Sequence, residues 1–125
     1  MKHLRIPLLA LTVYAAAHAS GAPRPSNAEL ARAENAIRSA ENAGATDHAR
    51  DLLDRARGDL AAAQHDWQDR RWESARRRIA ETEAAASAAE SKAKAMAMTR
   101  QADEWKREAD DFERRARELS PQAPQ

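Results

Sequence analysis

The chain has 125 residues, with 21 Lys and Arg against 20 Asp and Glu, and it contains no Cys. This length fits one small domain, and the lack of thiols excludes disulfides and thiolate metal sites. The near balance of charge gives no overall attraction to nucleic acid, so we expect no nucleic-acid partner. Much of the hydrophobic 42% is Ala, so a single copy has little large apolar surface to bury, and a partner helix would add to its stability.

The first residues have the order of a secretory signal peptide. Lys2 and Arg5 precede an apolar run over residues 6–17, and residues 17–19 read Ala-His-Ala, the small-x-small pattern of a cleavage site. The run is shorter than the roughly 20 residues that span a bilayer, which disfavours a membrane anchor. We therefore expect residues 1–19 to be removed, without lipidation because no Cys is present, and the product to lie in the periplasm. Loss of these two cations changes the formal net charge from +1 to −1.

The first helix is expected to begin just after a short lead-in. Residues 20–26 contain one Gly and two Pro and predict an extended segment. Ser26 and Glu29 have the spacing of a capping box. Gly44 is placed to end this helix in the left-handed conformation, and Thr46 is the expected cap of a second helix. So short a connection predicts an antiparallel helical hairpin.

The second helix is predicted from an apolar seam whose members recur at steps of three and four. These members are Ala49, Leu53, Ala56, Leu60, Ala63 and Trp67. Gly58 interrupts the helix at a cost of about 1 kcal/mol relative to Ala. Beyond Trp67 the same steps fall on polar residues, so we expect the chain to turn between Gln68 and Arg71.

A long third helix is predicted over residues 72–119, which contain no Gly or Pro and are rich in strong helix formers. At ~1.5 Å per residue it would be about 70 Å long, against about 30 Å for the second helix, so part of it should project beyond the hairpin. The sequence thus predicts an all-α, coiled-coil-like fold over residues 27–119. Residues 120–125, with two Pro, predict a disordered tail.

The apolar seam of the long helix changes phase near residues 96–98. One seam runs from Trp72 to Met96, and a second begins at Met98, two positions out of step. Such a jump indicates a coiled-coil stutter or a change of packing partner, unless the helix bends back there and covers itself. The large side chains of the second seam form a candidate helix-partner stripe, which favours a protein partner or a homo-oligomer. They are Met98, Trp105, Phe112 and Leu119.

A local cluster of arginines precedes and opens the long helix: Arg70, Arg71, Arg76, Arg77 and Arg78. One interpretation is a contact site for an anionic partner, such as peptidoglycan or an anionic membrane surface. The more ordinary interpretation is a solvated face on which these cations pair with Glu73, Glu81 and Glu83.

The residues offer no catalytic, cofactor or metal site. His65 and Asp69 lie one helical turn apart, but a bound metal usually needs three or four ligands. The serines Ser39, Ser74, Ser87 and Ser91 fall within helices, where hydroxyls normally bond back to the preceding turn. We therefore expect no catalytic residues, no cofactor and no enzymatic activity.

Residues 28 to about 97 resemble the bacterial envelope family called domain of unknown function 4398. The matching features are Leu30, Ala33 and Ile37, the Ala-Gly-Ala turn at residues 43–45, and the alanine and leucine ladder of the second helix. Members often show a Gly-Asp-aromatic turn before the third helix, whereas residues 69–72 of this chain read Asp-Arg-Arg-Trp and lack the Gly. Many members are lipoproteins or precede an OmpA-like peptidoglycan-binding domain. The resemblance implies an envelope location and a helical fold, with no catalytic residues to transfer.

These observations lead to two hypotheses about function. The first is a non-enzymatic exported protein that acts as a structural or protein-interaction module of the bacterial cell envelope. The alternative is a binding module for an anionic envelope polymer or membrane surface, using the arginines of residues 70–78. A helical-repeat adaptor is less favoured because the chain has too few repeats for a solenoid.

Overall fold

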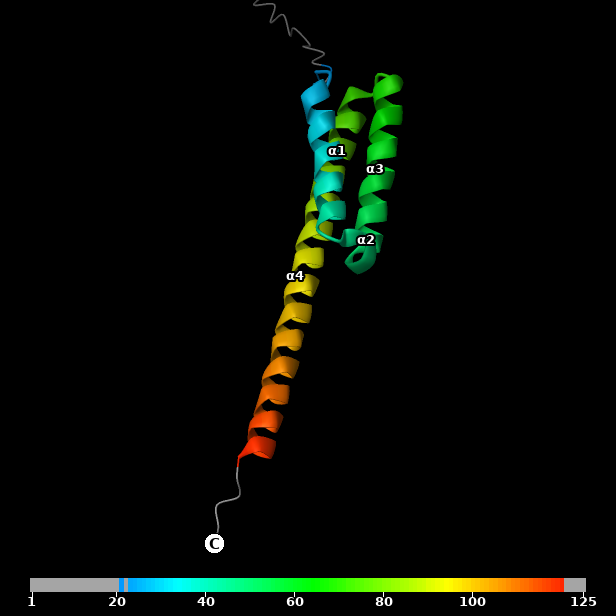
Figure 1. Cartoon of the computed structure of the whole chain (residues 1–125). Coiled ribbons are helices and arrows are strands. Elements are labelled where there is room, and N and C mark those ends of the chain that lie inside the picture. Colours follow the sequence, from blue (N-terminus) through cyan, green and yellow to red (C-terminus); the bar gives the residue numbers. More distant parts are fainter. Residues whose placement is uncertain (1–20, 22, 121–125) are drawn as a thin grey trace, which may run out of the picture.

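The structure is a computed structural model that describes residues 21 and 23–120, and these form four helices (Figure 1). They are α1 (Asn27–Asn42), α2 (Ala45–His48), α3 (Arg50–Gln68) and α4 (Trp72–Leu119). The fold is all-α, as predicted, with an antiparallel hairpin followed by a long helix. The predicted signal peptide, residues 1–19, and residues 121–125 of the predicted tail lie outside the described residues.

The long helix α4 is the common packing partner of the other helices. α1 and α3 run in opposite directions, and the first half of α4 lies alongside both of them (Figure 1). α4 contacts each of them more extensively than they contact each other. The two helices of the hairpin are therefore held together mainly by their shared contacts with α4.

Both ends of α1 are formed by the residues that the sequence predicted, the capping box at its start and Gly44 at its end. The Ser26 hydroxyl accepts a hydrogen bond from the Glu29 amide at 3.2 Å, and the Glu29 carboxylate accepts one from the Ser26 amide at 2.5 Å. This capping box lowers the pKa of Glu29, mainly because the Ser26 backbone N–H donates to the charged carboxylate. At the other end Gly44 has φ of 87°, the left-handed conformation that favours Gly.

The prediction of Thr46 as the cap of the second helix was wrong. A short helix, α2, begins at Ala45, because Gly44 turns the chain directly into helical geometry and its carbonyl accepts from Asp47 and His48 at 3.1 and 3.2 Å. The chain then breaks at Ala49, with φ of −148° and ψ of 38°, before α3 starts. Both Ala45 and Ala49 are thereby buried in the core. α3 continues through Gly58 without interruption.

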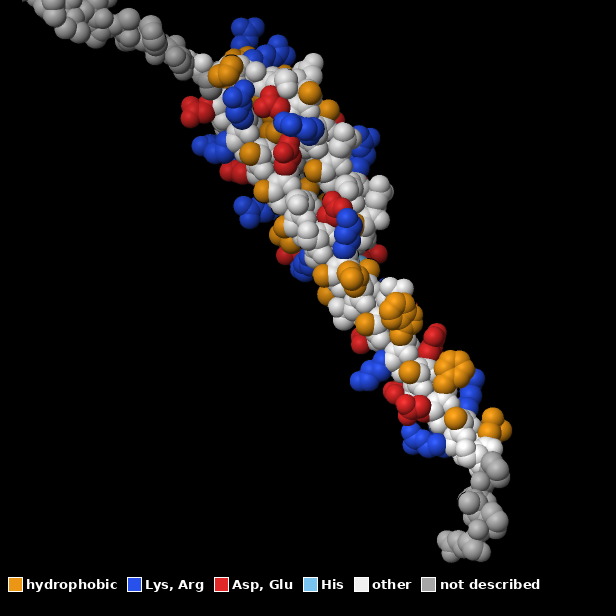
Figure 2. Space-filling view, turned by 90° about the vertical axis from the view of Figure 1, so that its left-hand side faces the viewer, with side chains coloured by type: hydrophobic (Ala, Val, Ile, Leu, Met, Phe, Trp, Pro, Cys, Tyr) orange, Lys and Arg blue, Asp and Glu red, His pale blue; other side chains and the backbone are white. Residues whose placement is uncertain are grey.

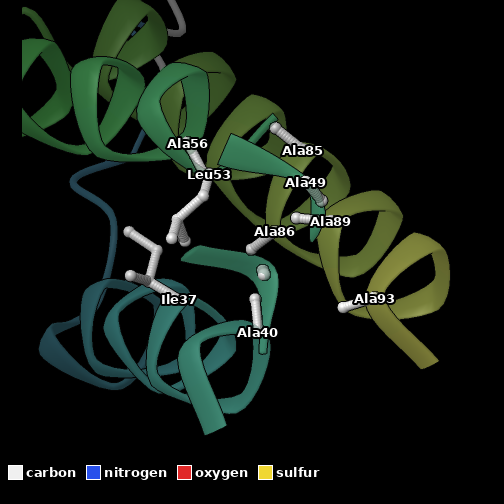
Figure 3. Close-up of a cluster of buried hydrophobic side chains, with 10 residues drawn as sticks. Ile37, Ala40, Ala49, Leu53, Ala56, Ala85, Ala86, Ala89 and Ala93 are labelled. Atoms are coloured by element: carbon white, nitrogen blue, oxygen red, sulfur yellow. The ribbon is translucent and has the colours of Figure 1, made fainter. Parts of the chain in front are cut away.

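The core is built mostly from alanine. Ile37 and Leu53 lie at its centre and are surrounded by small side chains of α1, α3 and α4 (Figure 3). On α4 these include Ala85, Ala86, Ala89 and Ala93. A second cluster joins Ala33, Ala63 and Ile79 nearer the other end of the bundle. The predicted seam of the second helix is confirmed, with Ala49, Leu53, Ala56 and Ala63 buried and Leu60 and Trp67 half-buried.

Beyond Ala93 no residue of α4 is buried. We call residues 94–119 the projecting segment, which is about 40 Å long at ~1.5 Å per residue and extends away from the bundle (Figure 1). α4 is continuous through residues 96–98, so the helix does not bend back to cover itself. The described helices include none with the length and apolarity needed to cross a membrane.

Candidate interaction surfaces

The end of the bundle where α3 meets α4 carries two tryptophans in contact. The rings of Trp67 and Trp72 meet edge to face, with centroids 6.0 Å apart and planes at 83°. The Arg24 guanidinium lies over both rings, 4.9 and 5.5 Å from their centroids, which is cation–π geometry. Pro25 is fully buried beside it. Arg24 and Pro25 of the lead-in therefore pack on the bundle, a feature that the sequence pattern did not predict.

The turn from α3 to α4 is a Schellman motif. The Arg70 amide donates to the Trp67 carbonyl at 3.1 Å, and the Arg71 amide donates to the Asp66 carbonyl at 2.8 Å. Arg70 occupies the left-handed position of this motif with φ of 59°. Glycine is the usual residue there, so Arg70 carries backbone strain. The predicted turn between Gln68 and Arg71 is confirmed.

Arg71 neutralises an acidic cluster at the same end of α3. One of its guanidinium nitrogens lies 2.7 Å from Asp66, 3.0 Å from Asp69 and 3.0 Å from Nδ1 of His65. A cation of the protein itself thus lies among the residues weighed as metal ligands, and the described residues contain no group of three or more such ligands.

Asp66 is the buried member of this cluster. The Ser74 hydroxyl donates to its carboxylate. This hydrogen bond, with the positive charge of Arg71, lowers the pKa of Asp66. The expectation that the Ser74 hydroxyl bonds back to the preceding turn was wrong, because the turn of the chain brings Asp66 within its reach. Asp66 and Ser74 thus hold α3 to the start of α4.

Two more arginines of the predicted cluster also have partners within the protein. Arg76 donates to the Pro23 carbonyl at 3.1 Å and lies 3.8 Å from Glu29. Arg78 lies 3.3 Å from Asp59 and 3.1 Å from Glu81. With Arg71, three of the five cations thus join the lead-in, α1, α3 and α4 to one another.

Arg70 and Arg77 differ from these three. Neither has an ion pair within 4.0 Å among the residues that the structure describes. Both line an open hollow of about 490 Å³, together with Gly21, Trp72 and Glu73. The arginine cluster therefore divides into three structural cations and two that face solvent.

The projecting segment carries the other predicted surface. Its large apolar side chains are exposed in the single chain: Met98 by 71%, Trp105 by 63%, Phe112 by 67% and Leu119 by 83%. They form a row along the free part of α4 (Figure 2). The segment's ion pairs are local, such as Arg114–Asp111 at 2.7 Å and Arg117–Glu113 at 3.0 Å.

The geometry defines an alanine-packed helical bundle with one helix extended beyond it. The chain belongs to the family described as Domain of unknown function (DUF4398), whose model matches residues 28–105. The match confirms the resemblance noted in the sequence and covers more than half of the chain. Its end at residue 105 leaves Phe112 and Leu119 of the stripe outside it. No curated protein and no solved structure matches the chain.

Proposed function

We propose that this protein is exported to the bacterial periplasm and acts there, without catalysis, as a protein-interaction or structural module. The projecting segment is the part that contacts its partner. The bundle anchors α4, and the part of this segment beyond Arg100, whose side chain still contacts His48 of α2, extends past the other helices.

The observation that carries the proposal is the exposure of Met98, Trp105, Phe112 and Leu119 on one side of α4, where no other part of the chain that the structure describes covers them. Single exposed apolar residues are normal on protein surfaces, but an aligned row of large ones marks an interaction site. Burying such a side chain against a partner contributes about 1.5–3 kcal/mol. Trp and Phe are also among the residues enriched at interfaces.

Export is supported by the order of charged, apolar and small residues in residues 1–19. The intact mass of the protein recovered from the periplasm tests it. We expect a chain that starts at Ser20, and a mass that retains residues 1–19 would contradict export by this route.

The interaction is tested by cross-linking in the envelope fraction of the source bacterium. We expect the Trp105→Ala, Phe112→Ala double variant to lose the cross-linked product. An Arg107→Ala, Arg114→Ala double variant, changed elsewhere on the same segment, should keep it. The product should also form when cross-linking is done in high salt, because apolar contacts are not screened. Retention of the product by the Trp105→Ala, Phe112→Ala variant would overturn the proposal.

The alternative function, binding of peptidoglycan or an anionic membrane surface, is favoured by Arg70 and Arg77 at the open hollow. Such binding would weaken in high salt and would be lost in an Arg70→Ala, Arg77→Ala variant. The internal pairing of Arg71, Arg76 and Arg78 leaves fewer free cations for it.

A further inference from the structure

Two parallel rows of apolar residues run along the projecting segment, one of large side chains and one of small side chains. The large row is the stripe already described, with members seven residues apart. The small row has the same spacing and consists only of alanine: Ala95, Ala102, Ala109 and Ala116. All eight residues are exposed. Alternating steps of four and three along one helix are the pattern of a coiled-coil seam.

This seam lies away from the other helices of the bundle. At 3.6 residues per turn, Ala102 is about 180° around α4 from Ala93, the last buried residue of the packed side. A second helix can therefore lie along the seam without meeting α1, α2 or α3. The last polar contact to α2 joins Arg100 to His48 at 3.2 Å, just before Ala102.

The sizes of the two rows favour antiparallel pairing with a second copy of the same helix. In antiparallel coiled coils each layer joins one row of the first helix to the other row of the second. Ala109 then meets Phe112 of the second copy, Trp105 meets Ala116, and Ala102 meets Leu119. Every layer combines one small and one large side chain. Parallel pairing would instead alternate layers of two alanines with layers of two large residues, which pack poorly.

The charges beside the seam favour the same direction. In the antiparallel arrangement Lys106 faces Glu113 of the second copy, and Glu108 faces its Arg115. Two-fold symmetry makes each of these opposite-charge pairs twice. In a parallel arrangement Glu108 would face Glu113 of the second copy, a like-charge contact that disfavours that pairing.

We propose that the partner of the projecting segment is a second copy of this chain, paired antiparallel over residues 102–119. This inference rests on the proposed function and names its partner. The overlap is about 27 Å long at ~1.5 Å per residue, so the interface is small and the dimer should have a micromolar Kd. The two bundles would lie at opposite ends of the paired helices.

Cross-linking between introduced cysteines tests the direction, because the chain has no Cys of its own. Ala102→Cys and Leu119→Cys variants of residues 20–125 are mixed and treated with a short bis-maleimide. Antiparallel pairing predicts products that join one variant to the other, identified by intact mass. Each variant alone should give little product, since equivalent positions lie about 25 Å apart along the helix. Efficient cross-linking of each variant to itself would overturn the inference.

A charge reversal gives opposite results for the two directions. Glu113→Lys should raise the Kd about tenfold in an antiparallel dimer, because Lys106 then faces a second Lys at two places. In a parallel dimer it would lower the Kd by removing the Glu108–Glu113 repulsion. Adding Lys106→Glu should restore the original Kd. Arg117→Ala, which breaks the same Arg117–Glu113 ion pair within α4, is the matched control and should leave the Kd unchanged.

Sedimentation equilibrium of these proteins distinguishes failure of this inference from failure of the proposed function. A monomer at high micromolar concentration, or a Kd unchanged by Glu113→Lys, would contradict the inference that a second copy is the antiparallel partner. The proposed function would then still stand if the Trp105→Ala, Phe112→Ala variant lost its cross-linked product in the envelope. Retention of that product by the variant would contradict both this inference and the proposed function.

Discussion

The two halves of α4 have the same helical geometry but differ in the size of their apolar side chains. In the packed half the buried seam consists largely of alanine, from Ala75 to Ala93, with Ile79 as its only large aliphatic member. In the projecting segment, which no other described helix buries, the seam carries Trp105 and Phe112 between alanines. Small side chains let α1 and α3 approach α4 closely, whereas the large ones of the projecting segment stand exposed on the single chain. The size of an apolar residue therefore does not locate the core of this protein.

The largest difference between the two halves should appear when one large side chain is removed from each environment. Leu53 is fully buried against the packed half. Leu53→Ala should therefore lower the free energy of unfolding by about 2–5 kcal/mol. Phe112→Ala should change it by at most about 0.5 kcal/mol in the dilute monomer. Urea unfolding followed by circular dichroism measures both, and equal losses would place Phe112 in the core of the monomer.

The same enlargement at two alanines of α4 sharpens the comparison. Ala86→Leu should lower the free energy of unfolding by about 1–3 kcal/mol, because Ala86 is completely buried and the extra atoms displace α1 and α3. Ala97→Leu should be close to neutral, since Ala97 is exposed and Leu is nearly as good a helix former as Ala. Thermal melts in dilute solution test this pair. A strong effect at Ala97 would contradict the free position of the projecting segment.

The turn at Gly44 lies in the bundle that packs against the first half of α4, and it should be sensitive to a branched side chain. Gly44→Val is expected to lower the free energy of unfolding by about 1–2 kcal/mol. The cause is backbone conformation rather than crowding, because a Cβ there meets only His48 Cδ2, at 3.7 Å. Gly58→Ala, inside α3 where the new Cβ would meet no atom beyond its own stretch of helix within 4 Å, should stabilise the fold by up to about 1 kcal/mol. Thermal midpoints compare the two, and an unchanged midpoint for Gly44→Val would mean that the turn tolerates the strain.

A modest gain in stability is expected at the other turn, between α3 and α4. Arg70→Gly should raise the free energy of unfolding by about 1 kcal/mol, because Gly adopts φ near 59° without a clash of its Cβ. Arg70→Ala removes the same charge and keeps the strain, so it separates the two effects. Equal stabilisation by both variants would assign the gain to charge instead of backbone conformation.

Local chemistry was enough to predict most of the helix ends. Ser26 and Glu29 fix the start of α1 through hydrogen bonds three residues apart, and Gly44 fixes its end through its own backbone freedom. The change from apolar to polar residues after Trp67 located the second turn. The length of α4 followed from composition, because nothing between Trp72 and Leu119 interrupts a helix.

The sequence by itself thus determined four features of this protein: the all-α class, the hairpin, the span of α4 and the two apolar seams on it. Only the tertiary structure decided which residues those seams meet and which arginines are free. Arg71 and Asp66, and Arg76 and Pro23, come together only after the helices have packed. Periodicity along one helix assigns a residue to a side of that helix, but contacts between distant segments depend on how the helices are placed in space. The same placement covers Ala93 and leaves Trp105 in solvent.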